Sequence, residues 1–438
     1  MKSSDQRVGA IVDAYSTGRH LAAELAPYGI KLVHVQSSAE ILSFDLPSFR
    51  PRDFLRNLIF EGRESQVSRE LAAIRPEFVV AGCESGVMVA DTLAEALGTP
   101  GNGTFRSQAR RDKALMAQAV AEAGLRTIKH IVTSSPKAAL AWKRLHNLEE
   151  IVIKPTNSAG TDDVFFCATE DEIIRSFSAI IGKINAMGSR NSEALVQERV
   201  EGRQFTANTV SHDGRHYLVE LWSYETVRVA GAGSLCDHEM LLDGGDAEVL
   251  TIAPYVFGVL DALHIRYGPA HVELFLDRKG PVLIEIGARM QGSMSRTARQ
   301  AALGHDHVML TALCLADPSL FTEYVRTNTP YRRRRHAVIV SILSDRSGRV
   351  LGHSGLSRVR TALTSFSDAF AFPCAGEELA VSRDLATTAG IVYLVHEDRA
   401  LVESDFKMLK ATPIEQLLDL APGSGSGTPS LQATPQRL

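Results

Sequence analysis

The chain has 438 residues, of which 45% are apolar, 22% charged and 6% aromatic, and its formal net charge is −4. At roughly 150 residues per domain this length predicts about three domains, with the composition of a globular protein rather than a disordered or fibrous one. A mildly acidic chain lacks the clustered cations that nucleic-acid phosphates require, no apolar run approaches the roughly 20 residues that span a bilayer, and the N-terminus lacks the layout of a secretory signal.

Residues 1–105 alternate short apolar runs with helical patterns. The runs RVGAIVD, KLVHV and EFVVAG predict strands, and STGRHLAAELAPYG, ESQVSRELAAI and GVMVADTLAEALG predict helices. This rhythm predicts βαβ units around a parallel sheet, a Rossmann-like N-terminal domain. The first strand–helix turn, DAYSTG, has the single glycine Gly18 where a dinucleotide site needs G-x-G-x-x-G. We therefore expect this domain to contact substrate or act as a scaffold.

Residues 106–320 predict an α+β domain with much antiparallel character. The charged helix QARRDKALMAQAVAEAG leads to a strand, the helix PKAALAWKRLHN and the strand EEIVIKP. Further strands are expected at SEALVQERV, RQFTANTV and RHYLVELW, followed by the helix YVFGVLDALH and the strands HVELFLD and PVLIEIG.

A third region, residues 321–420, predicts a small β-rich C-terminal domain. It contains HAVIVSIL, GIVYLVHED and the amphipathic stretch SDFKMLKA. The basic run Arg332–Arg335 precedes it, and we interpret this run as a solvated linker or phosphate-facing surface because no wider basic field surrounds it. Residues 421–438 are rich in Gly, Ser and Pro and predict a disordered tail.

Two glutamates stand on the two strands of a predicted hairpin, HVELFLDRKGPVLIEIG. If Leu276 pairs with Val282, the register places Glu273 directly opposite Glu285. Two carboxylates this close repel unless one is protonated or a cation lies between them. Mg²⁺ is typically bound by one or two carboxylates, and phosphate oxygens complete its coordination shell, so this pair is a candidate Mg²⁺ site. Two exposed glutamates on a solvent-facing sheet remain an equal alternative.

Lysines supply two further candidates. Lys154 ends the apolar strand EIVIKP, and the small and hydroxylated residues TNSAGT follow it, so that backbone N–H groups and an ammonium could meet one phosphate. This loop is not a Walker A loop, because it joins two strands and lacks G-x-x-x-x-G-K-[ST]. Lys113 lies on the charged helix, where a lysine alone is usually solvated. A surface hairpin with an exposed lysine is the plain alternative for Lys154.

The order of these pieces resembles the ATP-grasp superfamily over residues 106–316. A lysine on a helix is followed by a second lysine before a small-residue hairpin, then by the strand–hinge segment LVQERVEGRQF, and last by the glutamate pair and an arginine. The resemblance implies an ATP-grasp fold, with a lid at about 128–205, a preceding Rossmann-like domain and a small C-terminal domain.

The resemblance implies a role for each matching position. Lys113 and Lys154 would hold the ATP phosphates, Glu273 and Glu285 would bind magnesium, and Arg289 would stabilise the acyl phosphate and the tetrahedral intermediate. The remaining ATP contacts would come from the flexible loop and the adenine hinge: Ser158, Ala159, Gly160, Thr161, Gln197, Glu198, Arg199, Val200 and Gln204.

Three positions depart from the superfamily's usual pattern. Gln204 stands where many members have a ribose-binding glutamate, Asp163 where glycine is common, and Gly287 where asparagine often follows the second magnesium ligand. The pattern Glu285-x-small-Ala-Arg289, with His271 upstream, is closer to bacterial L-amino-acid ligases of the bacilysin and rhizocticin type.

The resemblance therefore implies an ADP-forming carboxylate–amine ligase that joins two amino acids through an acyl phosphate, as in dipeptide or γ-glutamyl-type specialised metabolites and antibiotics. His271 would position a substrate carboxylate or take the amine's proton, or it is only a spacer in its strand. Further substrate contacts are expected at Glu84 and Ser85, which follow a predicted strand, and in the segment after Arg289 at Met290 and Ser293.

Two alternatives stay open. One is a biotin-carboxylase-like enzyme that activates bicarbonate, although the chain has no A-M-K-M biotin-attachment motif. The other is a non-catalytic ATP-binding regulatory module, which would not require both lysines, both glutamates and the arginine.

The expected cofactors are ATP with one or two Mg²⁺ ions, Mn²⁺ being able to substitute, and the expected partners are amino acids and a second copy of the chain. Scattered cysteines without a C-x-x-C pair favour a reducing cytoplasm over disulfides or zinc: Cys83, Cys167, Cys236, Cys314 and Cys374.

Overall fold

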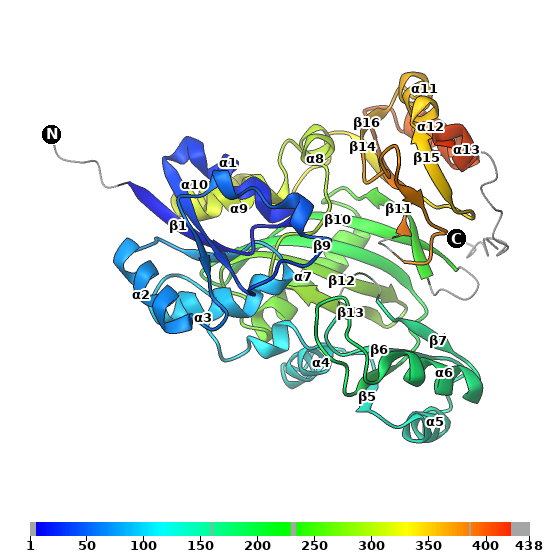
Figure 1. Cartoon of the computed structure of the whole chain (residues 1–438), viewed down its shortest axis with the longest axis horizontal. Coiled ribbons are helices and arrows are strands. Elements are labelled where there is room, and N and C mark those ends of the chain that lie inside the picture. The colour runs from blue at the N-terminus through cyan, green and yellow to red at the C-terminus, as the bar shows by residue number, and fades with distance from the viewer. Residues whose placement is uncertain (1–5, 159, 161, 229–233, 385–386, 422–438) are drawn as a thin grey trace.

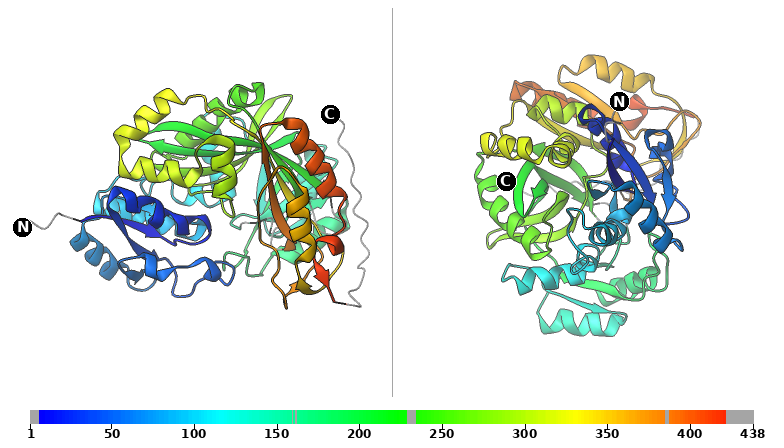
Figure 2. Two further views of the ribbon diagram at one scale, coloured as in Figure 1. Left: turned by 90° about the horizontal axis from the view of Figure 1, so that it is seen from above. Right: turned by 90° about the vertical axis from the view of Figure 1, so that its left-hand side faces the viewer.

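The computed structural model describes residues 6–158, 160, 162–228, 234–384 and 387–421. An N-terminal α/β unit, a small antiparallel unit and a C-terminal unit are arranged around a large central sheet, as Figures 1 and 2 show from three directions. The expected tail lies outside the described residues from 422 onward. Among the described helices, none combines the length and apolar character needed to cross a bilayer.

The N-terminal unit is the expected parallel sheet, with strand order β3-β2-β1-β4. The strands that the sequence predicted are present. The sheet also contains the three-residue strand β3, which the sequence pattern did not predict. The elements are β1 (Arg7–Val12), α1 (Leu21–Leu25), β2 (Ile30–Gln36), β3 (Asn57–Ile59), α2 (Glu64–Ile74), β4 (Val79–Ala81) and α3 (Val87–Leu97).

A four-stranded antiparallel sheet of order β5-β8-β6-β7 forms the second unit, with two helices packed on it. Its own hydrophobic cluster includes Trp142, Ile153 and Phe177. The elements, with the helix that precedes them, are α4 (Lys113–Glu122), β5 (His130–Thr133), α5 (Pro136–Leu145), β6 (Ile151–Pro155), β7 (Phe165–Cys167), α6 (Glu170–Ile180) and β8 (Ala194–Glu198).

The central sheet has eight antiparallel strands in the order β13-β12-β9-β10-β11-β14-β18-β16. Its strands are β9 (Arg203–His212), β10 (Arg215–Arg228), β11 (Ser234–Leu241), β12 (Gly268–Asp277), β13 (Gly280–Gly287), β14 (His336–Ile342), β16 (Phe366–Phe370) and β18 (Gly390–His396). Three of these, β14, β16 and β18, come from the C-terminal region, so that region continues the sheet of the middle one.

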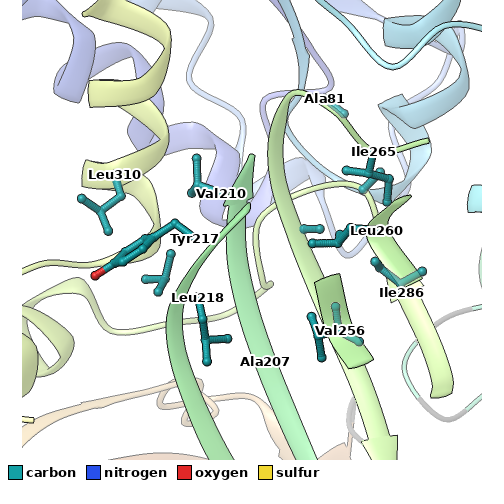
Figure 3. Close-up of a cluster of buried hydrophobic side chains, with 14 of the residues drawn as sticks. Ala81, Ala207, Val210, Tyr217, Leu218, Val256, Leu260, Ile265, Ile286 and Leu310 are labelled. Carbon is teal, nitrogen blue, oxygen red and sulfur yellow. The ribbon is translucent and has the colours of Figure 1, made fainter. Parts of the chain in front are cut away.

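The apolar face of this sheet is covered by α7 (Ala247–Ala262) and α9 (His307–Ala316), as Figure 3 shows around Ala207, Val256 and Leu310. The opposite face carries polar side chains, because alternate residues of a strand point to opposite sides. The remaining elements are α8 (Arg296–Leu303), α10 (Pro318–Thr327), β15 (Gly348–Gly352), α11 (Ser354–Ala362), β17 (Glu378–Leu379), α12 (Arg399–Ala411), α13 (Ile414–Leu417) and β19 (Asp419–Leu420).

Candidate active site

Glutamates on β12 and β13 stand opposite each other; the two strands lie near the middle of Figure 1. Glu273 is paired with Glu285, as the sequence predicted, although the assumed register at the turn is wrong. Leu276 pairs with Pro281 rather than with Val282, and a β-bulge then shifts the register by one residue before the glutamates. The extra residue of the bulge restores the facing pair.

Both predicted lysines meet this pair. Lys113 is the first residue of α4, whose N-terminus is capped by the Asp112 carboxylate, and its Nζ lies 2.8 Å from Glu285 Oε2. The same Nζ donates to the carbonyl of Ser158, 2.6 Å away, at the start of the small-residue loop. Lys154 is 7% exposed at the end of β6 and faces the same group of charges.

The charges around the pair shift two pKa values. Burial and, to a smaller extent, the Lys113 ammonium lower the pKa of Lys154 to about 8, against the opposing effect of Glu285 and Glu273. Although burial by itself raises the pKa of Glu285, the two lysines hold it well below its usual range. Glu285 is therefore a carboxylate at neutral pH, ready for a cation.

Arg289 is fixed by a residue from the N-terminal unit. Its Nε donates to Glu84 Oε2 over 2.7 Å, and Arg111 donates to the other Glu84 oxygen and to Asn157 Oδ1, the latter over 3.0 Å. Burial raises the pKa of the Glu84 carboxyl, but the two guanidiniums hold it below its usual value. Two arginines and one carboxylate thus converge beside the lysine–glutamate cluster.

The structure explains why a glycine occupies position 287. A Cβ there would lie 2.6 Å from Glu84 Oε2 and 3.0 Å from Arg289 Cζ, so a larger residue would displace the ion pair. The other unusual loop residue, Asp163, has a φ of 50°, the left-handed conformation that glycine adopts most easily. The crowding explains why this chain has glycine at position 287, whereas the φ at Asp163 explains only why glycine is common there.

His271 lies at the edge of the site, in a hydrogen-bonded chain. Its Nδ1 is 2.8 Å from Asn208 Oδ1, and its Nε2 is 3.7 Å from Glu273 Oε1. Asn208 Nδ2 donates to Glu220 Oε1 over 2.6 Å and to Gln291 Oε1 over 2.8 Å. Because this amide uses its nitrogen for those two contacts, its oxygen accepts from Nδ1–H, and Nε2 faces the glutamates.

The predicted adenine hinge begins in the last two residues of β8. Backbone N–H of Glu198 donates to the Lys129 carbonyl over 2.9 Å, and its side chain accepts from Lys129 N. Gln197 is buried within β8, Arg199 pairs with Glu150 at 2.8 Å, and Val200 continues the chain toward β9. On β9, Gln204 Nε2 is 3.5 Å from Glu273 Oε2, so Gln204 contacts one of the two candidate metal ligands.

The remaining predicted contacts are placed differently. Ser158 Oγ donates to Asp162 within the loop, Gly160 is exposed, and Ala159 and Thr161 lie outside the described residues. Ser85 Oγ donates to the buried Asp13 over 2.6 Å.

After Arg289, the Met290 side chain is 1% exposed and packs into the hydrophobic cluster of the N-terminal unit, so it faces core rather than substrate. Ser293 N donates to Ser16 Oγ over 3.3 Å, which joins this segment to the first strand–helix turn.

The donor set fits magnesium. Two facing carboxylates, of which Glu285 has a lowered pKa, supply hard oxygen ligands. In the described part of the chain no group of three or more His, Cys, Asp or Glu side chains is arranged to hold a metal. Phosphate and water oxygens would therefore complete the shell, the usual arrangement for Mg²⁺ with a nucleotide.

Sequence reasoning missed several buried polar residues on the same face of the sheet. Arg299, 0% exposed on α8, donates to both oxygens of Glu220 at 2.8 and 3.0 Å and to Gln291 Oε1 at 2.7 Å. Thr206 and Asn208 follow Gln204 at intervals of two in RQFTANTV, and this polar alternation was the available signal.

Comparison with known proteins agrees with this geometry. Residues 111–293 match the ATP-grasp domain family. Dapdiamide A synthase of Enterobacter agglomerans is 30% identical over 350 residues, covering 79% of this chain and 82% of that protein.

Solved structures give the same fold. The L-amino acid ligase from Bacillus licheniformis has a TM-score of 0.69 at 20% identity, covering 92% of this chain and 97% of its own. The biotin carboxylase domain of Hydrogenobacter thermophilus 2-oxoglutarate carboxylase has a TM-score of 0.63 at 12% identity, covering 95% and 91%. These likenesses confirm the fold class that the sequence predicted.

Proposed function

We propose, since the chain belongs to the ATP-grasp family, that it is an ADP-forming ligase that joins the carboxyl group of one amino acid to the amino group of another. The observation that carries the proposal is the facing pair Glu273 and Glu285. Lys113 forms an ion pair with Glu285, and Lys154 lies in the electrostatic field of both glutamates. A purely structural role does not require two buried lysines and two carboxylates around one point.

The first step activates the acid. A carboxylate oxygen attacks the γ-phosphorus of ATP, the bond from this phosphorus to the bridging oxygen breaks, and ADP leaves with the electron pair. Lys113 and Lys154 neutralise charge on the transferring phosphoryl group, where catalysis depends on positioning and electrostatic stabilisation. Magnesium held by Glu273 and Glu285 would supply the remaining positive charge.

The second step forms the amide. The amine nitrogen attacks the acyl carbon, the bond to the phosphoryl oxygen breaks, phosphate leaves, and the nitrogen gives up a proton as the amide forms. Arg289 is oriented by Glu84 and stabilises the oxyanion of the tetrahedral intermediate. Loss of one such donor costs on the order of 10²–10³ in rate.

The substrates are two amino acids, and the product is a dipeptide or γ-glutamyl-type amide of specialised, antibiotic-type metabolism in the cytoplasm. Support comes from the 30% identity to dapdiamide A synthase. The division of labour follows the proposed regions: 1–105 supplies Glu84, 106–320 supplies the nucleotide groups with its lid at 128–205, and 321–420 completes the site. His271 acts on a substrate through its Nε2, and Ser293 borders the substrate space.

The test is ADP release over pairs of amino acids, with mass spectrometry of the products from a mixed pool. We expect ADP release only with an acceptable pair, and a product mass equal to the sum of the two amino acids less water. Bicarbonate-dependent ADP release without an amine would instead support the carboxylase alternative. ATP binding without ADP release for any pair would support the regulatory one.

A further inference from the structure

Glu239 on β11 is a nearly buried carboxylate that the steps above leave unused. It is 8% exposed, and its Oε2 accepts a hydrogen bond from Thr206 Oγ1 at 3.2 Å. Thr206 lies on β9, and β10 separates β9 from β11. The Glu239 side chain therefore lies across the intervening strand and points toward the glutamate pair, because Thr206 is itself paired with Glu273.

This carboxylate has no matching cation. Within the described residues it forms no ion pair, and its Oε1 accepts no hydrogen bond, yet Oε1 is not closed off from solvent. Arg299 is the guanidinium that lowers the pKa of Glu239, but its Nε already donates to both Glu220 oxygens. A buried carboxylate without a partner is costly, so a fold with no use for it would replace it.

Glu239 lies among ionisable side chains that include Glu273, one of the two candidate metal ligands. The ionisable side chains that interact electrostatically with Glu239 come from its own strand and four neighbouring elements: Cys236 of β11, Glu220 and Tyr224 of β10, Glu273 of β12, Arg299 of α8 and Tyr393 of β18. Carboxylates outnumber the one arginine among them. The charges around Glu239 therefore favour a cation, and one of those charges belongs to Glu273 of the proposed metal pair.

We propose that Glu239 binds the ammonium group of the amino acid that serves as the amine, and takes its first proton. The inference rests on the proposed function, because only a ligase needs a second, cationic substrate next to the activated acid. One N–H bond of the ammonium breaks and its electron pair stays on nitrogen, the proton moves to a Glu239 oxygen, and the free amine then attacks the acyl carbon.

The energetics agree with this role. Burial raises the pKa of Glu239 to about 7, against the opposing effect of Arg299 and the Thr206 hydrogen bond. A group with a pKa near the working pH can both hold an ammonium and accept its proton.

The experiment compares two nucleophiles in wild type and Glu239→Gln. Hydroxylamine is small and uncharged at neutral pH, so it traps an acyl phosphate as a hydroxamate without needing a carboxylate to bind it. We expect Glu239→Gln to lower kcat/KM for the amine substrate by about ten- to a hundredfold, the usual effect of one charged hydrogen bond. Hydroxamate formation and the KM for ATP and acid should stay within about twofold.

Glu397→Gln is the matched control, because Glu397 is an exposed glutamate at the end of β18, and both reactions should be unchanged in it. Amide and hydroxamate formation that fall together in Glu239→Gln would overturn the inference and indicate a structural role, as would amide formation that does not fall. Wild type that forms neither ADP nor hydroxamate with any amino acid would refute the proposed function, and this inference with it.

Discussion

Replacing Glu239 with glutamine should stabilise the protein at alkaline pH. The unfolded chain loses the carboxyl proton near 4.5, whereas the folded protein keeps it to about 7 because the group is buried. Between these values the unfolded state binds fewer protons, so the folded state loses stability as pH rises, and the loss is complete above about 7. Glutamine has nearly the same shape and carries no charge.

The size of the effect follows from the two pKa values. At about 1.4 kcal/mol for each pH unit, the difference between 4.5 and about 7 corresponds to about 3 kcal/mol of stability lost by wild type above pH 7. At pH 5 the folded wild type is mostly protonated, and less than about 1 kcal/mol is lost. The stability advantage of Glu239→Gln should therefore grow by about 2 to 3 kcal/mol from pH 5 to pH 8.

Urea denaturation of both proteins at pH 5, 6, 7 and 8 measures this difference, because every other titrating group is common to both chains. The reasoning predicts a urea midpoint for Glu239→Gln that rises relative to wild type as pH increases. A difference that does not change with pH would show that the pKa of Glu239 is not raised by folding, and a variant less stable than wild type at pH 8 would show that the carboxylate is paired and stabilising.

Three further substitutions test other parts of the site and fold. Glu285→Gln should lower ADP release at least about a hundredfold, because it removes charge from both the metal pair and Lys113, and unchanged release would contradict the assignment. Gly287→Ala should lower kcat about ten- to a hundredfold with little change in melting temperature, since its Cβ displaces Arg289, and a normal kcat would refute that crowding. Arg110→Met should cost about 3–5 kcal/mol in urea denaturation by leaving Asp91 buried and unpaired, and a loss below about 1 kcal/mol would show that the pair is dispensable.

The parts of the site that lie close together in the chain were accessible from sequence. Alternating apolar residues predicted the hairpin that carries Glu273 and Glu285, and the apolar strand before a run of small residues marked Lys154. The β-bulge was not accessible, because nothing in the period-2 pattern distinguishes a bulged strand from a regular one. The carboxylates face each other because of that bulge.

Contacts between segments that lie far apart in the chain could not be predicted from the sequence. Arg289 and Glu84 are 205 positions apart, and their ion pair depends on how the N-terminal unit docks against β13. No strand was predicted at Glu239, and nothing in the sequence indicated that its side chain crosses β10 to contact Thr206. Pairing of β11 with β14 likewise joins two regions that the sequence indicated as separate domains.

The central claim is that a substrate carboxylate is phosphorylated by ATP before an amide forms. An amino acid labelled with ¹⁸O in its carboxyl group tests this directly, with ³¹P NMR or mass spectrometry of the released phosphate. The account predicts one ¹⁸O atom in each phosphate, with ADP and dipeptide formed in equal amounts. Phosphate without ¹⁸O, or release of AMP and pyrophosphate, would contradict it.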